Sequence, residues 1–173
     1  MSGLIVFQWD GEAMAPMRRF RAECDRAFTI GEFYRMEIQE DRSWRSHKHY
    51  FAVLHQGWAS LPERYDLEPW AQSAEHLRHF ALISVGLFDS KIIQCASNPE
   101  AVRWAAYLRP MKPFSIVTAV RSTVVEQTAK SQSPAAMRNA AFQQSKGLVL
   151  DFIAGLSGTT REQLIGAAAK FAQ

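Results

Sequence analysis

Residues 41–62 read DRSWRSHKHYFAVLHQGWASLP, and this stretch decides most of what the sequence says about the fold. Apolar residues recur in it at three- and four-residue steps, namely Phe51, Leu54, Trp58 and Leu61. Side chains with that spacing share one face of an α-helix, so we expect this face to pack against a core. We expect Ser43 or Ser46 to cap the first turn, and Pro62 to end the helix because proline does not continue one.

The other side of this predicted helix is polar, and its residues are Arg45, Lys48, His49, His55 and Gln56. Arg42 adds a cation ahead of the first turn, where backbone N–H groups are unpaired and the helix dipole is positive. These features together predict a phosphate-binding site at the helix start. The alternative is a charged face that is only solvated.

The histidines of this stretch do not predict a metal site. His47 and His49 point to different sides of a helix, and His55 lies two turns beyond His47. One ion does not readily collect all three side chains, so we expect no metal ligands here.

Composition bounds the class of protein. The chain has 173 residues, 47% of them hydrophobic and 12% aromatic, which predicts one domain with a core rather than a disordered protein. Cys24 and Cys95 form no CxxC pair and are typical of reduced core residues in a cytosolic protein. The first residues carry no basic leader, and no apolar stretch is long enough to span a membrane. We expect a soluble, cytoplasmic protein without a membrane partner.

Charge is distributed unevenly along the chain, whose net charge is +3. Residues 101–150 alone carry +6, because only Glu126 opposes the cations Arg103, Arg109, Lys112, Arg121, Lys130, Arg138 and Lys146. The remaining residues therefore sum to −3. This asymmetry predicts one face built for an anion.

Periodicity and turn residues predict an α+β order of elements. Strands are expected over residues 4–9, 29–39, 91–96 and 114–129. The strand over residues 91–96 is expected to be buried, and the stretch 114–129 to be divided near residues 121–122. Helices are expected over residues 17–27, 41–62, 73–87, 98–108, 133–155 and from 159 onward. No repeat or linker divides them, so we expect residues 1–173 to form a single α+β domain, in which a small mixed or antiparallel sheet packs with about five or six helices.

Three further predicted helices begin with capping signals. Two of them place a capping side chain before a proline, namely Asn98-Pro99 and Ser133-Pro134. Thr159 and Glu162 have the spacing of a capping box. The helix that follows Pro99 is expected to bury Val102, Ala105 and Ala106.

Signatures of catalysis are absent from the sequence, which has no phosphate-binding glycine loop and no GxGxxG, HExxH or GxSxG motif. We therefore expect a protein that is not an enzyme, with no catalytic residue and no cofactor. The alternative is a metal-dependent nuclease that uses the acidic residues Glu40, Asp41, Glu63, Asp66 and Glu68. Carboxylates beside helices are, however, ordinary solvation and capping devices.

An aromatic residue lies among the first cations, because Trp44 stands between Arg42 and Arg45. Single-stranded nucleic acid is held by this combination: cations contact phosphates, and each base stacked on an aromatic ring contributes about 1–3 kcal/mol. If the fold gathers them, the later cations Lys112, Arg121, Lys130, Arg138 and Lys146 would extend the surface.

The same residues resemble a known family. The matching segments are Asp41-Arg42-Ser43, Ser46-His47-Lys48, and Tyr50-Phe51-Ala52 with Leu54. They resemble the signature of the NinB (Orf) family of phage recombination proteins, in which Arg-Ser precedes Gln-Asn-Arg, an aromatic residue, Ala and Leu. They also resemble a group of uncharacterised prophage proteins with His-Arg-Lys, two aromatic residues and Ala-Leu-Leu. Ser46 and His47 depart from the NinB pattern, which has Gln and Asn there.

The resemblance implies a phage or prophage accessory factor of DNA recombination. Such a protein is a non-catalytic homodimer that binds single-stranded DNA and the host single-strand-binding protein, and helps to load a recombinase. By position, the matched residues are Arg42, Ser43, Lys48 and Phe51, of which Phe51 is expected to be structural. The full set expected to contact nucleic acid is Arg42, Ser43, Trp44, Arg45, Lys48, His49, Lys112, Arg121, Lys130, Arg138 and Lys146.

The alternative from another class is a phage-encoded interaction module that binds a host protein. Its contact patch would be the apolar residues of the last two helices, with Phe152 and Phe171 partly exposed.

Overall fold

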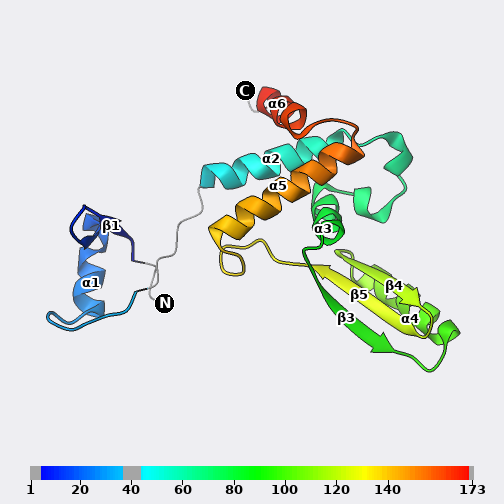
Figure 1. Ribbon diagram of the computed structural model, residues 1–173, viewed down its shortest axis with the longest axis horizontal. Coiled ribbons are helices and arrows are strands. Elements are labelled where there is room, and N and C mark those ends of the chain that lie inside the picture. The colour runs from blue at the N-terminus through cyan, green and yellow to red at the C-terminus, as the bar shows by residue number, and fades with distance from the viewer. Residues whose placement is uncertain (1–4, 37–43, 172–173) are drawn as a thin grey trace. The chain divides into compact units, whose positions relative to one another are not determined.

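The computed structural model describes residues 5–36 and 44–171, and the backbone alone for residues 44, 45 and 171. Contacts between Cα atoms divide the chain into two compact units, residues 1–38 and 39–173, and each is described by itself (Figure 1). Six α-helices and two small antiparallel sheets occur in the described residues, which confirms the expected α+β class. The expectation of a single domain stays a prediction.

The first unit begins with a hairpin of β1 (Phe7–Trp9) and β2 (Met14–Pro16). Its turn is held by Asp10, whose Oδ1 accepts hydrogen bonds from the backbone N–H groups of Ala13 (2.8 Å) and Glu12 (2.9 Å). These bonds to Ala13 and Glu12 lower the pKa of the Asp10 carboxyl. The strand expected over residues 4–9 is confirmed for residues 7–9, whereas the second strand was not expected.

A short 3-10 helix, η1 (Arg18–Phe20), and α1 (Arg21–Ala27) complete the regular structure of this unit. The strand expected over residues 29–39 is wrong for residues 29–36, where no strand forms. The chain turns back there instead, so that the Tyr34 ring packs on Phe28 at 4.9 Å and its hydroxyl accepts a bond from the Thr29 N–H (2.8 Å). A local side-chain bond therefore replaces a strand pairing. Residues 37–39 lie outside the described residues.

Four helices form the larger part of the second unit: α2 (Trp44–Ala59), α3 (Ala74–Ser84), α5 (Asn139–Leu156) and α6 (Arg161–Phe171). Two 3-10 turns, η2 (Glu63–Tyr65) and η3 (Pro69–Ala71), connect α2 to α3. The helices enclose one core, which includes Tyr50, Leu82, Phe142 and Ile153. We call these four helices the bundle. No helix in the described part of the chain is long and apolar enough to cross a membrane.

A three-stranded sheet and α4 (Asn98–Met111) form the rest of this unit, which we call the sheet layer (Figure 1). Its strands are β3 (Phe88–Gln94), β4 (Ser115–Val120) and β5 (Thr123–Ala129), in the antiparallel order β3-β5-β4. The division expected near residues 121–122 is confirmed: β4 turns into β5 at Arg121, whose φ is 55°. The α4 helix packs on β4 and β5 over a small core of its own.

The buried face of α2 agrees in part with the expected one, since Leu54 is buried and Trp58 and Leu61 pack partly buried against the bundle core. The fully buried side chains are Tyr50, Val53 and Leu54, whereas Phe51 is 37% exposed. Gly57 lies on the same face, and a Cβ there would stand 2.5 Å from Ile153 Cγ2 of α5. The residues at 50, 53, 54 and 57 have the helical spacing that the prediction assigned to Phe51 and its partners.

Three helix details also depart from expectation. The α5 helix begins at Asn139, because residues 133–137 form a turn in which the Ser133 carbonyl accepts bonds from Ala136 and Met137. The capping box of α6 is one residue later than expected, since the Thr160 and Gln163 side chains each accept a bond from the other's backbone N–H. On α4 the buried residues are Ala101 and Ala105, so burial of Val102 and Ala106 was wrong.

The strand β3 is an exposed edge strand. It pairs with β5 alone, and Ile92 is 70% exposed. The expectation of a buried strand over residues 91–96 was therefore wrong, although Cys95 just beyond β3 is buried as expected. A short apolar run has the same pattern in a buried and in an edge strand, so the sequence did not separate the two.

Gln132, in the loop after β5, lies at the centre of a buried polar network. Its Oε1 accepts hydrogen bonds from Tyr50 Oη (3.2 Å) on α2 and from Arg78 Nη1 (3.0 Å) on α3. Its Nε2 donates to Ser145 Oγ on α5 (2.8 Å). Burial raises the pKa of Tyr50 to about 12, so the phenol keeps the proton that it donates. This network joins three helices of the bundle.

Candidate functional site

The first predicted contact residues are only partly within the described structure. Arg42 and Ser43 lie outside it, and the side chains of Trp44 and Arg45 are not described. Trp44 is the first residue of α2, so the predicted helix start is confirmed at the level of the backbone. Their contact with nucleic acid stays a prediction.

The first turn of α2 lies against α5. Ser46 Oγ accepts hydrogen bonds from Lys146 Nζ (3.3 Å) and from Gln143 Nε2 (3.5 Å). The His47 ring lies 5.9 Å from the Phe142 ring. One of the later cations, Lys146, is thereby brought to the beginning of the basic stretch, from 100 residues away in the sequence.

The helices α2 and α5 run in the same direction. Ser46 contacts Gln143 near both N-termini, and farther along Gly57 lies close to Ile153. Both helices therefore begin at the same end of the bundle, as Figure 1 shows. We call this end the paired helix starts, defined by residues 44–48 and 138–146. Both carry the positive end of a helix dipole.

The first turns of these two helices contain no acidic residue, and the N-cap residue of α5, Arg138, makes no capping hydrogen bond through its side chain. The other α-helices each have a carboxylate in the first turn, namely Glu23, Glu75, Glu100 and Glu162. A carboxylate there offsets the helix dipole, so the paired helix starts are the one place among the six helices where the sequence omits it.

Several of the predicted contact residues lie at or near the paired helix starts. Lys48, His49 and Arg138 are exposed, whereas Lys146 is half-buried. Burial lowers the pKa of the Lys146 ammonium group. Its hydrogen bond to Ser46 compensates part of that desolvation and fixes the group beside α2.

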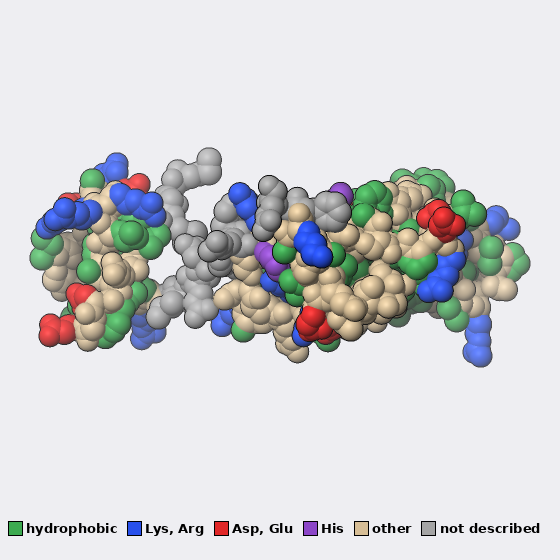
Figure 2. Space-filling view, turned by 90° about the horizontal axis from the view of Figure 1, so that it is seen from above, with side chains coloured by type: hydrophobic (Ala, Val, Ile, Leu, Met, Phe, Trp, Pro, Cys, Tyr) green, Lys and Arg blue, Asp and Glu red, His purple; other side chains and the backbone are tan. Residues whose placement is uncertain are grey.

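The other predicted cations lie in the sheet layer. Lys112 Nζ pairs with the buried Glu126 carboxylate at 3.4 Å. Arg121 lies in the turn between β4 and β5, and Lys130 follows β5 directly. On the face drawn in Figure 2, Lys and Arg side chains of residues 39–173 lie in separate places rather than in one patch. The structure thus gathers Arg138 and Lys146 with Lys48 and does not gather the whole set.

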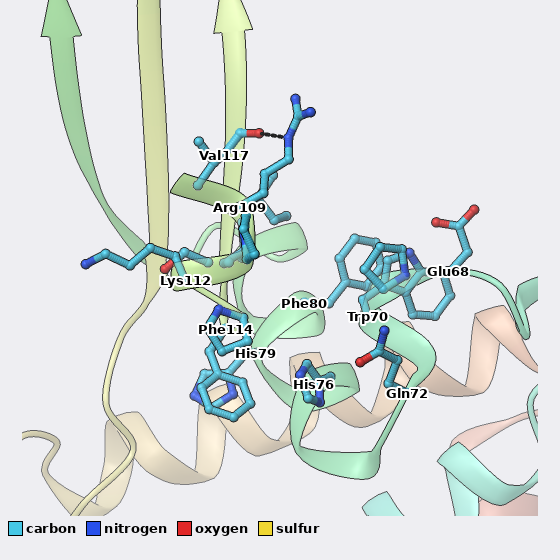
Figure 3. A pocket seen from close by; sticks show the side chains of 16 residues that line it. Glu68, Trp70, Gln72, His76, His79, Phe80, Arg109, Lys112, Phe114 and Val117 are labelled. Atoms are coloured by element: carbon cyan, nitrogen blue, oxygen red, sulfur yellow. Dashed lines mark hydrogen bonds between the residues drawn. The ribbon is translucent and has the colours of Figure 1, made fainter. Parts of the chain in front are cut away.

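A cavity of about 740 Å³ lies between the bundle and the sheet layer, and the sequence analysis did not identify it. Its walls are aromatic (Figure 3). The rings of Trp70 and Phe80 stack at 4.4 Å with an interplanar angle of 8°. The Phe114 ring packs 4.8 Å from His76 and 4.6 Å from His79.

Polar groups line the same cavity. Arg109 Nε donates to the Val117 carbonyl (3.0 Å), as the dashed line in Figure 3 marks. His76 Nδ1 lies 2.7 Å from Ser73 Oγ. Gln72 and Lys112 also line the cavity. The lining comes from residues 68–83 and 109–117, which are separate in the sequence, so only packing of α4 and β4 near α3 creates the site.

His79 lies in this wall as a neutral imidazole. Burial, and then the charge of Arg78, lower its pKa. Nδ1 lies 2.9 Å from the Glu75 carbonyl and Nε2 lies 3.0 Å from Arg78 Nη2. These partners assign the proton to Nδ1, which donates to Glu75, while Nε2 accepts from Arg78. Both ring nitrogens are thus used within the fold.

The acidic residues bear on the nuclease alternative, which needs a metal site. The described residues hold no group of three or more His, Cys, Asp or Glu side chains that fits a metal ion. Glu40 and Asp41, which belong to the nuclease alternative, lie outside the described residues.

Comparisons of the chain with protein-family models, with curated proteins and with solved structures found no match. The resemblance of residues 41–54 to the NinB family stays a prediction from the sequence.

Proposed function

We propose that this protein is a non-catalytic, single-stranded-DNA-binding accessory protein of phage or prophage recombination, which contacts phosphates at the paired helix starts. The observation that carries the proposal is that α2 and α5 begin side by side without an acidic residue in either first turn. The hydrogen bonds of Ser46 hold the two starts together.

The physical argument rests on the charge of the nucleic-acid backbone. Two aligned helix dipoles favour an anion at this end of the bundle. Lys48, Arg138 and Lys146 add cations, and Arg42 and Arg45 lie at or just before the first residues of α2 in the sequence. A single strand also offers unstacked bases, for which Trp44 is the nearest aromatic residue in the sequence.

The test is fluorescence anisotropy with labelled single- and double-stranded oligonucleotides over a range of salt concentrations. The wild-type protein is expected to bind the single strand with an affinity that falls steeply with salt. Each phosphate contact contributes about 0.7 to the slope of log K against log salt. The double variant Arg45→Ala/Lys48→Ala is expected to lose about 1.4 of that slope.

A matched control removes two cations elsewhere. Arg103 on α4 and Lys170 on α6 are both exposed, so Arg103→Ala/Lys170→Ala makes the same change in net charge. This control is expected to keep the wild-type slope. An unchanged slope in Arg45→Ala/Lys48→Ala would show that the start of α2 is not the contact surface.

The proposed homodimer has a candidate surface on α4. Trp104, Tyr107 and Met111 follow helical spacing and are 45%, 59% and 58% exposed. This face is separate from the patch that the host-protein alternative expects on the last two helices, where Phe152 is half-buried and packs 5.8 Å from Phe80. The side chain of Phe171 lies outside the described residues. Large exposed apolar residues on one helix face favour a protein contact.

Light scattering after size-exclusion chromatography tests the dimer. The wild-type protein is expected to elute at twice its chain mass of 19.6 kDa, and Trp104→Glu at the mass of one chain. Val102→Glu, on the opposite side of α4 and 52% exposed, is the control that should stay dimeric. A monomeric wild-type protein would remove the homodimer from the proposal.

A further inference from the structure

The cavity between the bundle and the sheet layer has the chemistry of a ligand site. It shares no lining residue with the paired helix starts. Its volume of about 740 Å³ lies within the range of roughly 300–1,000 Å³ that small-molecule sites occupy. Such sites combine apolar walls with a few convergent polar groups, and this cavity has both.

The walls suit a flat ring. Trp70 and Phe80 form one stacked pair, which comes from η3 and α3. Phe114, which follows α4, is 40% exposed although it packs against two histidine rings. Figure 3 shows these two aromatic groups around the same space. An aromatic surface left open inside a cavity favours a planar ligand that stacks on it.

Arg109 is an exposed cation that lines the cavity. Its Nε is fixed by the Val117 carbonyl, which orients the guanidinium group. Within the described residues neither Nη atom has a hydrogen-bond or ion-pair partner. The neighbouring Lys112 ammonium is instead paired with Glu126. Arg109 is therefore the cation with donors still to satisfy, in the planar arrangement that matches a phosphate.

Two further groups suit the edge of a heterocycle. In the described part of the chain, neither the Gln72 amide nor His76 Nε2 has a hydrogen-bond partner. An amide offers both a donor and an acceptor, and an imidazole nitrogen offers one of them. Glu68, the carboxylate that lines the cavity, lies on the Trp70 side in Figure 3, away from Arg109. A carboxylate there accepts bonds from a sugar hydroxyl or an exocyclic amino group.

We propose that this cavity binds a nucleotide. The base stacks on the aromatic walls, Gln72 and His76 bond to its edge, and the phosphate lies at Arg109. The nucleotide has two sources with the same chemistry: a free mononucleotide, or one unit of a single strand. The inference does not depend on the paired helix starts, because a free mononucleotide needs only the cavity.

The experiment is isothermal titration calorimetry with adenosine monophosphate, cytidine monophosphate, the matching nucleosides and a twelve-residue oligothymidine. A mononucleotide is expected to bind about tenfold more tightly than its nucleoside, as one charge-assisted contact to Arg109 predicts. Arg109→Gln is expected to abolish that tenfold difference. If only the oligonucleotide binds and Arg109→Gln weakens it, the nucleotide belongs to a strand.

Three further variants distinguish binding in the cavity from a loss of folding and from binding elsewhere. Gln72→Ala removes an exposed side chain without a hydrogen bond in the described structure, so it is expected to weaken binding severalfold and leave folding intact. Arg103→Gln, on α4 outside the cavity, is the control that should bind like the wild-type protein. Lys48→Ala should leave mononucleotide affinity unchanged, which separates this site from the proposed DNA contact. The inference is overturned if neither Gln72→Ala nor Arg109→Gln alters any nucleotide or oligonucleotide affinity.

Discussion

The bundle and the sheet layer place their large side chains in opposite ways. The core of the bundle includes the fully buried Tyr50, Phe142, Leu82 and Ile153. The buried apolar residues of the sheet layer are Cys95, Ala101, Ala105, Val117 and Val124, none larger than valine. Its larger apolar side chains, such as Ile92 and Tyr107, are 70% and 59% exposed. The bundle therefore supplies most of the hydrophobic stability, and the sheet layer keeps apolar surface for contacts with other molecules.

The bundle and the sheet layer also differ in how completely their polar groups are hydrogen-bonded within the fold. In the bundle, Gln132 satisfies the buried groups of Tyr50, Arg78 and Ser145. In the cavity beside the sheet layer, the Nη atoms of Arg109 have no partner among the described residues. Hydrogen bonds that are completed within the fold stabilise it, whereas donors left open at a cavity are free to recognise a ligand.

The largest expected effect tests the difference between the two cores. Leu82→Ala in the bundle is expected to lower the free energy of unfolding by about 3–4 kcal/mol, because it leaves a cavity in a fully buried site. Ile92→Ala on β3 is expected to cost less than about 1 kcal/mol, since that side chain is 70% exposed. Urea denaturation measures both. Equal losses would mean that the sheet layer is as important to stability as the bundle.

The next effect concerns the buried network. Gln132→Ala is expected to lower the free energy of unfolding by about 2–3 kcal/mol, because it leaves buried groups of Tyr50 and Arg78 without their acceptor. Gln144→Ala, at an exposed position of α5, is the matched control and is expected to change stability by less than about 0.5 kcal/mol. A small effect at position 132 would show that water or another side chain replaces the amide.

A smaller effect is expected from two glycine substitutions that test how closely α2 packs on α5. Gly57→Ala places a Cβ 2.5 Å from Ile153 Cγ2, so overpacking is expected to cost about 1–2 kcal/mol despite the better helix propensity of alanine. Gly155→Ala meets no atom within 4 Å and should stabilise α5 by up to about 1 kcal/mol. Thermal unfolding of the two variants is expected to shift in opposite directions. A shift in the same direction would mean that α2 and α5 lie farther apart.

The smallest expected effect is a dependence of the free energy of unfolding on pH, which arises from His79 and Glu75 of α3 beside the cavity. Burial lowers the pKa of His79 from its usual 6.5, and the hydrogen bond from Arg78 lowers the pKa of Glu75 from 4.5. Both groups take up a proton less readily in the folded state than in the unfolded state. The free energy of unfolding is therefore expected to fall as the pH drops below about 6.5, and further below about 4.5.

Melting temperatures at pH 7.5 and 5.5 measure the contribution of His79. His79→Gln is expected to melt at a lower temperature than the wild-type protein at pH 7.5 and to show a smaller difference between the two pH values. His55→Gln, at an exposed position of α2, serves as the control. An identical difference in wild type and His79→Gln would remove the histidine from this account.

Local patterns predicted the elements better than their faces. The helices near residues 44–59, 74–84 and 98–111, and the pair of strands divided at Arg121, follow from periodicity, capping residues and turn signals. The face of α2 was assigned correctly for Leu54 but not for its edges: Phe51 and Val53 lie at opposite edges of the apolar arc, and packing of the bundle buries the Val53 edge and leaves Phe51 partly exposed. The start of α5 was misassigned because Ser133-Pro134 suits a turn as well as a helix.

The sequence by itself determined the α+β class, the position of the basic stretch at a helix start, and the excess of cations in residues 101–150. These follow from neighbours along the chain, whose spacing is set by backbone geometry. Only the tertiary structure decided that α2 and α5 begin side by side, that Lys112 pairs with Glu126, and that Trp70, Phe114 and Arg109 line one cavity. The reason is that partners such as Lys112 and Glu126, or Ser46 and Lys146, lie 14 and 100 residues apart, so their meeting depends on the packing of whole helices and strands, which no local pattern encodes.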